Sequence, residues 1–187
     1  MVELTSLPDQ YQYLLDEPSP RILIQALKEY GTLEASGTED NPKIVGWAQE
    51  IGRPVSLNYQ HDSTPWCGLF MAVCAKRAGL DLPPAPLWAL SWSRWGDDFK
   101  GPIMLGDVLT FKRAGGGGHV ALYVGEDKTH YHILGGNQKD QVCIVRKPKG
   151  DAGGLYAARR TRWRISQPPN IRRVFLANSG IIAGSED

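Results

Sequence analysis

The chain has 187 residues, of which 42% are hydrophobic and 22% are charged, and its formal net charge is +1. This length and composition predict one globular domain with a core of its own, and they exclude an intrinsically disordered chain. Three cysteines without a CxxC pair argue against a disulfide framework and against a cysteine-rich zinc site. Because no apolar run approaches the roughly 18 residues of a membrane span, we expect no stable membrane insertion.

The first 20 residues contain acids and prolines where a signal peptide would have an apolar run. We therefore expect synthesis in the cytoplasm without a signal peptide. If the protein acts outside the cytoplasm, another route must carry it there.

Charge is distributed unevenly along the chain. Residues 1–145 hold 12 Lys/Arg and 17 Asp/Glu, whereas residues 146–173 hold nine Lys/Arg and a single acid, Asp151. Such a basic segment either attracts an anionic polymer, for example a bacterial wall, or forms the solvated face of a strand and a tail. No aromatic RNA-binding motif or helix-turn-helix pattern accompanies the charge, so we expect no nucleic-acid partner.

The predicted elements are helices first and strands afterwards. A helix is expected after Ser19 and Pro20 with Gly31 as its stop, a second one over "PKIVGWAQEIG", and a third over residues 64–79. From about residue 103 the pattern changes to short strands: "DVLTFK", "GHVALYVG", "HYHILGG", "QVCIVRK" and "LYAARRTRW". This order predicts an α+β fold in which N-terminal helices pack on a mostly antiparallel sheet. We expect an N-terminal arm over 1–19, the main domain over 20–163 and a basic C-terminal arm or tail over 164–187.

Cys67 lies where the third helix is expected to begin. Thr64 is a suitable N-cap and Pro65 suits the first helical position, which would make Cys67 the third helical residue. A thiol there lies beside unpaired N–H groups and the positive end of the helix dipole, and both favour the reactive thiolate. The same N–H groups can hold an oxyanion. The alternative is that Cys67 is a small core residue, which we expect Cys74 to be.

A nucleophilic cysteine requires a base, and His119 in "GGGGHVALYVG" is the candidate. Strand alternation puts His119, Ala121 and Tyr123 on one face and the intervening valines and leucine on the other. His130 and His132 share a face of the next predicted strand, but no third ligand accompanies them, so no metal site is expected. His61 is predicted to lie in a loop, where it would be at most a substrate contact.

Asn137 in "ILGGNQ" is the candidate for a third role, which is to orient the histidine. It follows the strand after His119, and a side-chain amide there would accept the imidazole N–H and fix its tautomer. The alternative is that Asn137 is only a turn residue, because Gly-Gly-Asn is common in turns.

These motifs together resemble the NlpC-type and CHAP superfamily of papain-like cell-wall hydrolases. The resemblance rests on "DSTPWCGLFMAVCAKRAG", "GDVLTF", "GHVALYVG" and "LGGNQ" in this order, and it covers roughly residues 22–163. It is strongest to a small bacterial and phage group with a Thr-Pro-Trp-Cys signature. Two features depart from the superfamily: Trp-Cys-Gly stands where Asp-Cys-Ser is usual, and the run Gly115–Gly118 is long for such a turn.

The resemblance implies a papain-like fold and a cysteine peptidase or amidase that cuts an amide bond of peptidoglycan without a cofactor or metal. Carried over by motif, Cys67 is the nucleophile, His119 the general base and Asn137 the third polar residue. Asp62 and Trp66 match signature positions and are predicted to contact substrate. The bond is either in a stem or crossbridge peptide or joins N-acetylmuramic acid to L-alanine.

The resemblance also suggests where such an enzyme acts. A phage lysin would reach the wall after holin-dependent release, and a secreted antibacterial effector would be injected and paired with an immunity protein in its producer. The alternatives are an acyltransferase or transpeptidase of the same fold and a non-catalytic wall-binding module.

Overall fold

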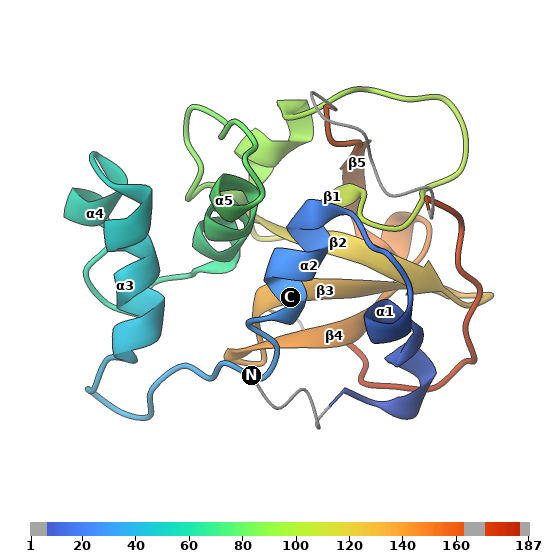
Figure 1. Ribbon diagram of the computed structural model, residues 1–187, viewed down its shortest axis with the longest axis horizontal. Coiled ribbons are helices and arrows are strands. Elements are labelled where there is room, and N and C mark those ends of the chain that lie inside the picture. The colour runs from blue at the N-terminus through green and yellow to red at the C-terminus, as the bar shows by residue number, and fades with distance from the viewer. Residues whose placement is uncertain (1–6, 163–170, 184–187) are drawn as a thin grey trace.

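Five antiparallel strands form a single sheet, with helices packed on it (Figure 1). The computed structural model describes residues 7–162 and 171–183. The strands are β1 (Val108–Lys112), β2 (Gly118–Glu126), β3 (His130–Gln138), β4 (Gln141–Pro148) and β5 (Leu155–Arg159). The helices are α1 (Tyr13–Asp16), α2 (Arg21–Leu27), α3 (Pro42–Ile51), α4 (Val55–Asn58) and α5 (Cys67–Arg77). The α+β class and the mostly antiparallel sheet are thus confirmed.

The order of the strands is β4-β3-β2-β1-β5. Successive hairpins join β1 to β4, whereas β5 returns to pair with β1 at the opposite edge. In the β1–β2 hairpin Phe111 lies opposite His119, and Lys112 lies opposite Gly118. This register places the start of β2, with its histidine, beside the end of β1.

The two faces of the sheet have separate cores, as the alternation in β2 predicts. Val120, Leu122 and Val124 pack in the larger core with the helices. Ala121 and Tyr123 belong to a smaller core on the other face. Residues that share a face with Ala121 therefore lie on the side of the sheet that α5 does not cover.

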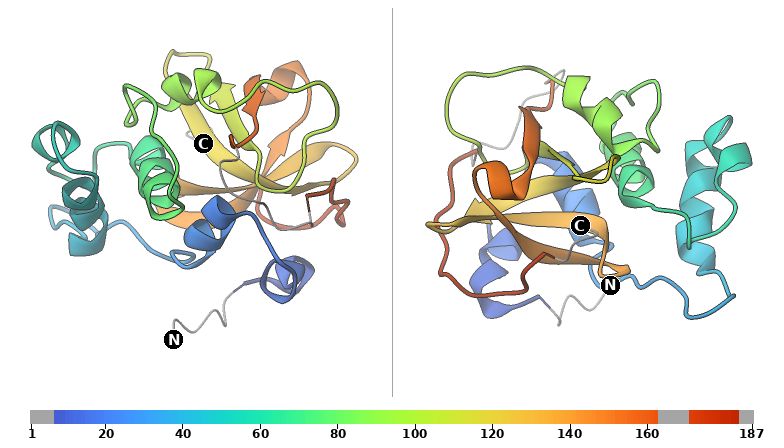
Figure 2. Two further views of the ribbon diagram at one scale, coloured as in Figure 1. Left: turned by 45° about the horizontal axis from the view of Figure 1, so that its top comes forward. Right: turned by 180° about the vertical axis from the view of Figure 1, so that it is seen from behind.

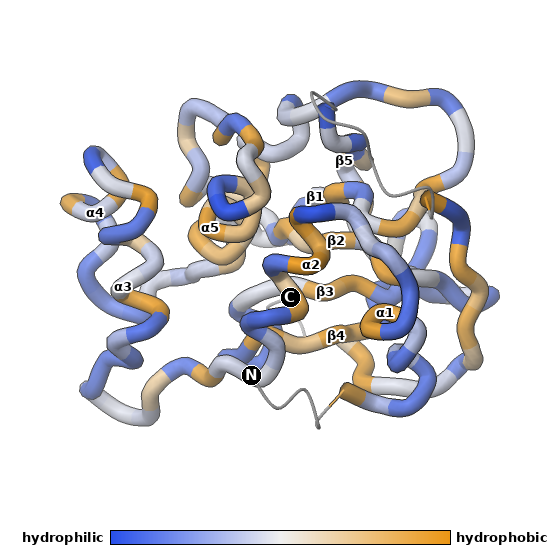
Figure 3. Tube along the Cα trace, viewed as in Figure 1, coloured by the Kyte–Doolittle hydropathy of each residue, from blue (hydrophilic) through white to orange (hydrophobic). Residues whose placement is uncertain are grey.

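Helix α5 is buried because its sequence is apolar on every side. It packs against β2 and β3 on one side and against α2 and α3 on the other (Figures 1 and 3). Its last turn carries Lys76 and Arg77, where cations are favoured, and Gly79 follows in a left-handed conformation with φ 76°. The expected end of the helix is therefore confirmed.

The expected start of this helix is wrong by two residues. Trp66 is the N-cap, without a side-chain cap, and Cys67 is the first helical residue instead of the third. The Thr64 amide instead donates to the carbonyl of His61, in a turn that precedes the helix. The cysteine consequently lies closer to the unpaired amides than the sequence predicts.

The two ends of the chain share in the core. Leu7, Tyr11 and Leu14 are buried with the helices, and Val174 joins the same cluster. The segment 171–183 follows the ends of the strands on the side away from α3 and α4 (Figures 1 and 2). Of residues 164–187, expected to form a basic arm or tail, 171–183 make up this segment, and 164–170 and 184–187 are outside the described residues.

Most arginines of the basic region form ion pairs within the molecule. Arg160 binds Asp107 at 2.7 Å, Arg172 binds Glu17 at 2.6 Å, and Arg173 binds Glu126. Because acids from the first part of the chain neutralise these cations, the charge asymmetry of the sequence does not translate directly into a free basic surface.

Candidate functional site

Cys67 lies at the junction of α5 and β2 and is only 3% exposed. Burial raises the pKa of its thiol, although hydrogen bonds from the backbone N–H groups of Val120, Gly68 and Cys67 and the charge of Arg113 act in the opposite direction. The expectation of a thiolate held by the helix start is therefore wrong for this closed structure. The N–H groups are present as expected, but the loss of water outweighs them.

The contact with the Val120 amide places the sulfur beside the residue that follows His119. His119 is fully buried, and its Nε2 lies 3.0 Å from Oε1 of Gln138. Burial lowers the pKa of His119 to about 3, with the charges of Lys147 and Arg113 acting in the same direction. The imidazole is therefore neutral at physiological pH, and it is not exposed at a cleft edge as the sequence suggests.

The tautomer of His119 follows from the hydrogen bonds of its partner. Nε2 of Gln138 donates to the carbonyl of Cys143 at 2.6 Å and to that of Ile133 at 3.4 Å. This fixes the amide so that its oxygen faces His119, and a carbonyl oxygen accepts only. The proton of His119 is therefore on Nε2, and Nδ1 carries the lone pair. Nδ1 is buried and has no hydrogen-bond partner among the described residues.

The residue that orients His119 is thus Gln138, not Asn137. Asn137 has φ 58°, a left-handed conformation that asparagine tolerates better than most residues, at an irregularity between Gly135 and Gln138. This irregularity shifts the alternation of side chains between the two faces of β3, so that the side chain of Gln138 reaches His119. Asn137 therefore fits the turn-residue alternative.

The two glycines before Asn137 are required by close approaches on opposite faces. A Cβ on Gly135 would lie 2.8 Å from Oε1 of Gln138, and a Cβ on Gly136 would lie 2.6 Å from the side chains of Trp66 and Phe70. The pair of glycines lets the orienting amide lie flat on one face of β3 while the first turn of α5 packs on the other.

A segment of irregular chain covers the site. A Cβ on Gly68 would lie 2.3 Å from the carbonyl oxygen of Leu87 and 2.6 Å from that of Pro86. A Cβ on Gly118 would meet the side chain of Leu90 at 2.5 Å. The segment 86–90 therefore passes directly over the start of α5 and of β2. This explains why glycine follows the cysteine, where a serine would collide with backbone.

Asp62 and Trp66 are buried and bind other parts of the protein. Oδ2 of Asp62 accepts the backbone N–H groups of Ala35 and Asn41, each at 2.8 Å. Nε1 of Trp66 donates to Glu34 at 2.8 Å, and its ring packs on Trp47 at 5.8 Å. Both side chains tie the loop before α3 to the segment that leads into α5. Neither side chain forms a hydrogen bond with Cys67 among the described residues. They position the helix start in this structure.

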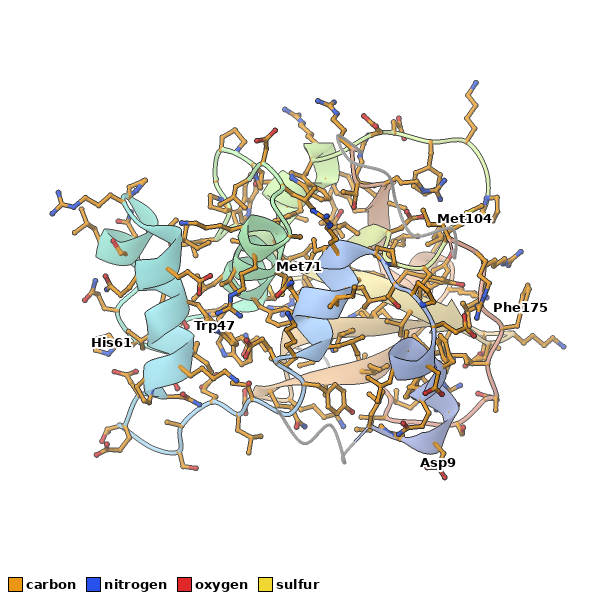
Figure 4. The ribbon with its side chains drawn as sticks, in the orientation of Figure 1. Asp9, Trp47, His61, Met71, Met104 and Phe175 are labelled. Carbon is orange, nitrogen blue, oxygen red and sulfur yellow. The ribbon has the colours of Figure 1, made fainter. Side chains whose placement is uncertain are left out.

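The other histidines lie outside the site. His61 is exposed at the outer side of α3 and contacts Asp40 at 3.0 Å (Figure 4). His132 is buried between Tyr11, at 2.7 Å, and Asp127, at 2.9 Å. Asp127 also binds Arg146, so this network links the N-terminal segment to β3 and β4. In residues 7–162 and 171–183 no group of three His, Cys, Asp or Glu side chains is arranged to hold a metal ion.

Comparisons with known proteins add no relative. No protein-family model, no curated protein and no solved structure matches the chain. No helix in the described part of the chain is both long and apolar enough to cross a membrane.

Sequence reasoning missed two residues of this site. Gln138 adjoins the predicted asparagine, and the signal that favours it is the preference of asparagine for positive φ, which assigns Asn137 to the backbone turn. Arg113 precedes the glycine run of the β1–β2 hairpin, and nothing local in the sequence distinguishes it from a surface arginine.

Proposed function

We propose that the protein is a cysteine hydrolase that cuts an amide bond of peptidoglycan, with Cys67 as nucleophile, His119 as general base and Gln138 as the residue that orients the base. One observation carries the catalytic part: a buried histidine has its Nε2 bound to a fixed amide oxygen and its lone pair at Nδ1 without a partner, and the next residue, Val120, donates its backbone N–H to the thiol at the start of α5. The choice of peptidoglycan is supported by the motif resemblance to papain-like cell-wall hydrolases.

The reaction starts from a neutral pair, because burial raises the pKa of the thiol and lowers that of the imidazole. Sγ of Cys67 attacks the amide carbonyl carbon while its proton moves to Nδ1 of His119. The backbone N–H groups at the start of α5 stabilise the oxyanion of the tetrahedral intermediate. The C–N bond then breaks, and the leaving amine takes the proton from His119.

Hydrolysis of the acyl-enzyme reverses the proton movement. Nδ1 of His119 takes a proton from a water molecule, whose oxygen attacks the thioester carbonyl. The C–S bond breaks, the carboxylic acid is released, and the thiol regains the proton. Gln138 holds the imidazole in the tautomer required for each step, since its oxygen accepts the Nε2 proton throughout.

Substrate reaches the sulfur only if the segment 86–90 moves. Cys67 is 3% exposed and His119 is fully buried, so an amide carbonyl has no access to Sγ in the closed arrangement. The same exclusion of water favours a second candidate, an acyltransferase or transpeptidase in which an amine replaces water as the acceptor.

Purified peptidoglycan is the direct test. The wild-type protein should release soluble fragments with new amine ends, which mass spectrometry identifies together with the bond cut. Cys67→Ala should release none while it stays folded, whereas Cys74→Ala, which alters a buried thiol in the middle of α5, should keep the activity at some loss of stability. New amide links would indicate the transferase. Unchanged peptidoglycan with wild-type protein would refute both and leave a binding module.

The place of action remains part of the proposal. A phage lysin released through a holin and an effector with an immunity partner both bring such a hydrolase to the wall. Expression of the protein in the bacterial cytoplasm and in the periplasm separates a lysin or effector from a housekeeping enzyme. We expect lysis only after delivery to the periplasm and only when Cys67 is present.

A further inference from the structure

Arg113 is a half-buried cation without an anionic partner in the described part of the chain. It follows β1, and its backbone N–H donates to the carbonyl of Gly117 at 3.4 Å, which extends the β1–β2 hairpin by one step. Its Nε is buried and has no hydrogen-bond acceptor within residues 7–162 and 171–183. A buried guanidinium N–H without an acceptor destabilises the folded state, because it has lost its hydrogen bond to water and forms none within the protein.

The other arginines show how unusual this is. Every other described arginine that is at least half-buried has a carboxylate within 4 Å: Arg77 with Glu50, Arg146 with Asp127, Arg159 with Asp98, Arg160 with Asp107 and Arg172 with Glu17. The described arginines without a carboxylate, apart from Arg113, are exposed to water: Arg21, Arg53 and Arg94. Arg113 alone in this described set is both shielded and unpaired.

The position of Arg113 relates it to the Cys67–His119 pair. Phe111, two residues earlier, lies opposite His119 in the hairpin, and the hydrogen bond from Arg113 to Gly117 continues the same ladder toward the turn. Its positive charge acts on both Cys67 and His119. The unpaired cation therefore lies at the end of the hairpin that carries His119, where its charge reaches Cys67 as well.

We propose that Arg113 is the subsite for a carboxylate of the substrate, so that the preferred amides carry a free carboxylate next to the bond that is cut. A guanidinium suits this role, because its planar N–H groups match the two oxygens of a carboxylate. The inference rests on the proposed role of Cys67 as the nucleophile, but not on peptidoglycan as the substrate.

Alkylation of Cys67 tests the subsite without any substrate. Iodoacetate and iodoacetamide are nearly the same size, and only the first carries a carboxylate. In both reactions Sγ displaces iodide from the methylene carbon, iodide leaves with the bonding electrons, and the thiol proton goes to a base. Peptide mapping by mass spectrometry measures the rate of alkylation at Cys67 separately from that at the other cysteines. The ratio of the two rate constants cancels any change in thiol pKa, because that change affects both reagents equally.

The expected result is a fall of about tenfold in the iodoacetate-to-iodoacetamide ratio in Arg113→Gln, equivalent to about 1.4 kcal/mol. Arg113→Lys should retain part of the ratio. The control is Lys112→Gln, which removes the same charge one residue earlier, where Lys112 is exposed and lies over the ring of Tyr156 at 3.7 Å. This variant should keep the wild-type ratio. An unchanged ratio in Arg113→Gln, or an equal fall in Lys112→Gln, overturns the subsite.

If the closed structure protects Cys67 from both reagents, thermal unfolding with N-acetylglycine and with its amide replaces alkylation. A larger rise in Tm with the acid, lost in Arg113→Gln, supports the subsite, and equal rises overturn it. Cleavage of peptidoglycan without a change in either measurement refutes the subsite alone. A changed ratio without cleavage of any peptidoglycan refutes the proposed function and leaves the carboxylate subsite in place.

Discussion

Lowering the pH from about 7 to about 5 should destabilise the protein through His119 by about 2 kcal/mol. The folded protein keeps this imidazole neutral, because burial lowers its pKa to about 3 from an ordinary value of 6.5. The unfolded chain takes up a proton as the pH falls through that ordinary value, and the folded chain does not. The unfolded state therefore binds more protons between these two values, and stability is present above the unfolded pKa and is lost as the pH falls.

The measurement is urea unfolding of the wild-type protein and of His119→Asn at about pH 7 and about pH 5. Asparagine does not titrate in this range. The free energy of unfolding of the variant should therefore fall by about 2 kcal/mol less than that of the wild type between the two pH values. Burial also lowers the pKa of His132, but this histidine is present in both proteins and its contribution cancels. The two proteins differ in absolute stability, and only the change with pH is compared.

The choice of window separates His119 from Glu126. Lys149 and Arg173 hold the pKa of Glu126 at about 2 against the opposing effect of burial, so the stability linked to this acid is lost below the window. If the free energy of unfolding changed equally with pH in the wild type and in His119→Asn, His119 would take up its proton equally in the folded and the unfolded state. The description of His119 as a buried neutral base would then be wrong.

Two further pairs of variants test the site. Gln138→Ala should lower kcat by about tenfold or more, because the imidazole loses its orienting acceptor. Asn137→Gly should keep the wild-type kcat, because glycine suits the positive φ at this position. If Asn137→Gly lowered kcat and Gln138→Ala did not, Asn137 would be the residue that orients His119. Gly68→Ala should destabilise the protein by about 1–3 kcal/mol in urea unfolding, because its Cβ meets backbone carbonyls. Gly46→Ala, with open space in α3, should stabilise it by up to about 1 kcal/mol, and similar effects of both changes would contradict the close cover over the site.

Local pattern was sufficient to predict the five strands and the helices α2, α3 and α5, but not the short helices α1 and α4. The five strands fall on the short alternating or apolar runs after residue 103, and α5 ends where Gly79 follows two cations. The division of β2 between two cores follows from its period of two, which places Val120 and Ala121 on opposite faces. These features depend on neighbours in the chain, so the sequence alone carries the information.

The chemistry of the candidate site depends on contacts between distant segments. The sequence predicts the pairing of Cys67 with His119 as candidates, but the irregularity in β3 decides that Gln138, one residue past the expected asparagine, reaches the imidazole. The helix start favours a thiolate, yet the chain that covers Gly68 excludes water and reverses the shift of the thiol pKa. Arg113 differs from a surface arginine because folding buries its Nε while no acid pairs with it in the described structure. Desolvation and pairing are sums over the whole surroundings of a group, and only the tertiary structure brings those surroundings together.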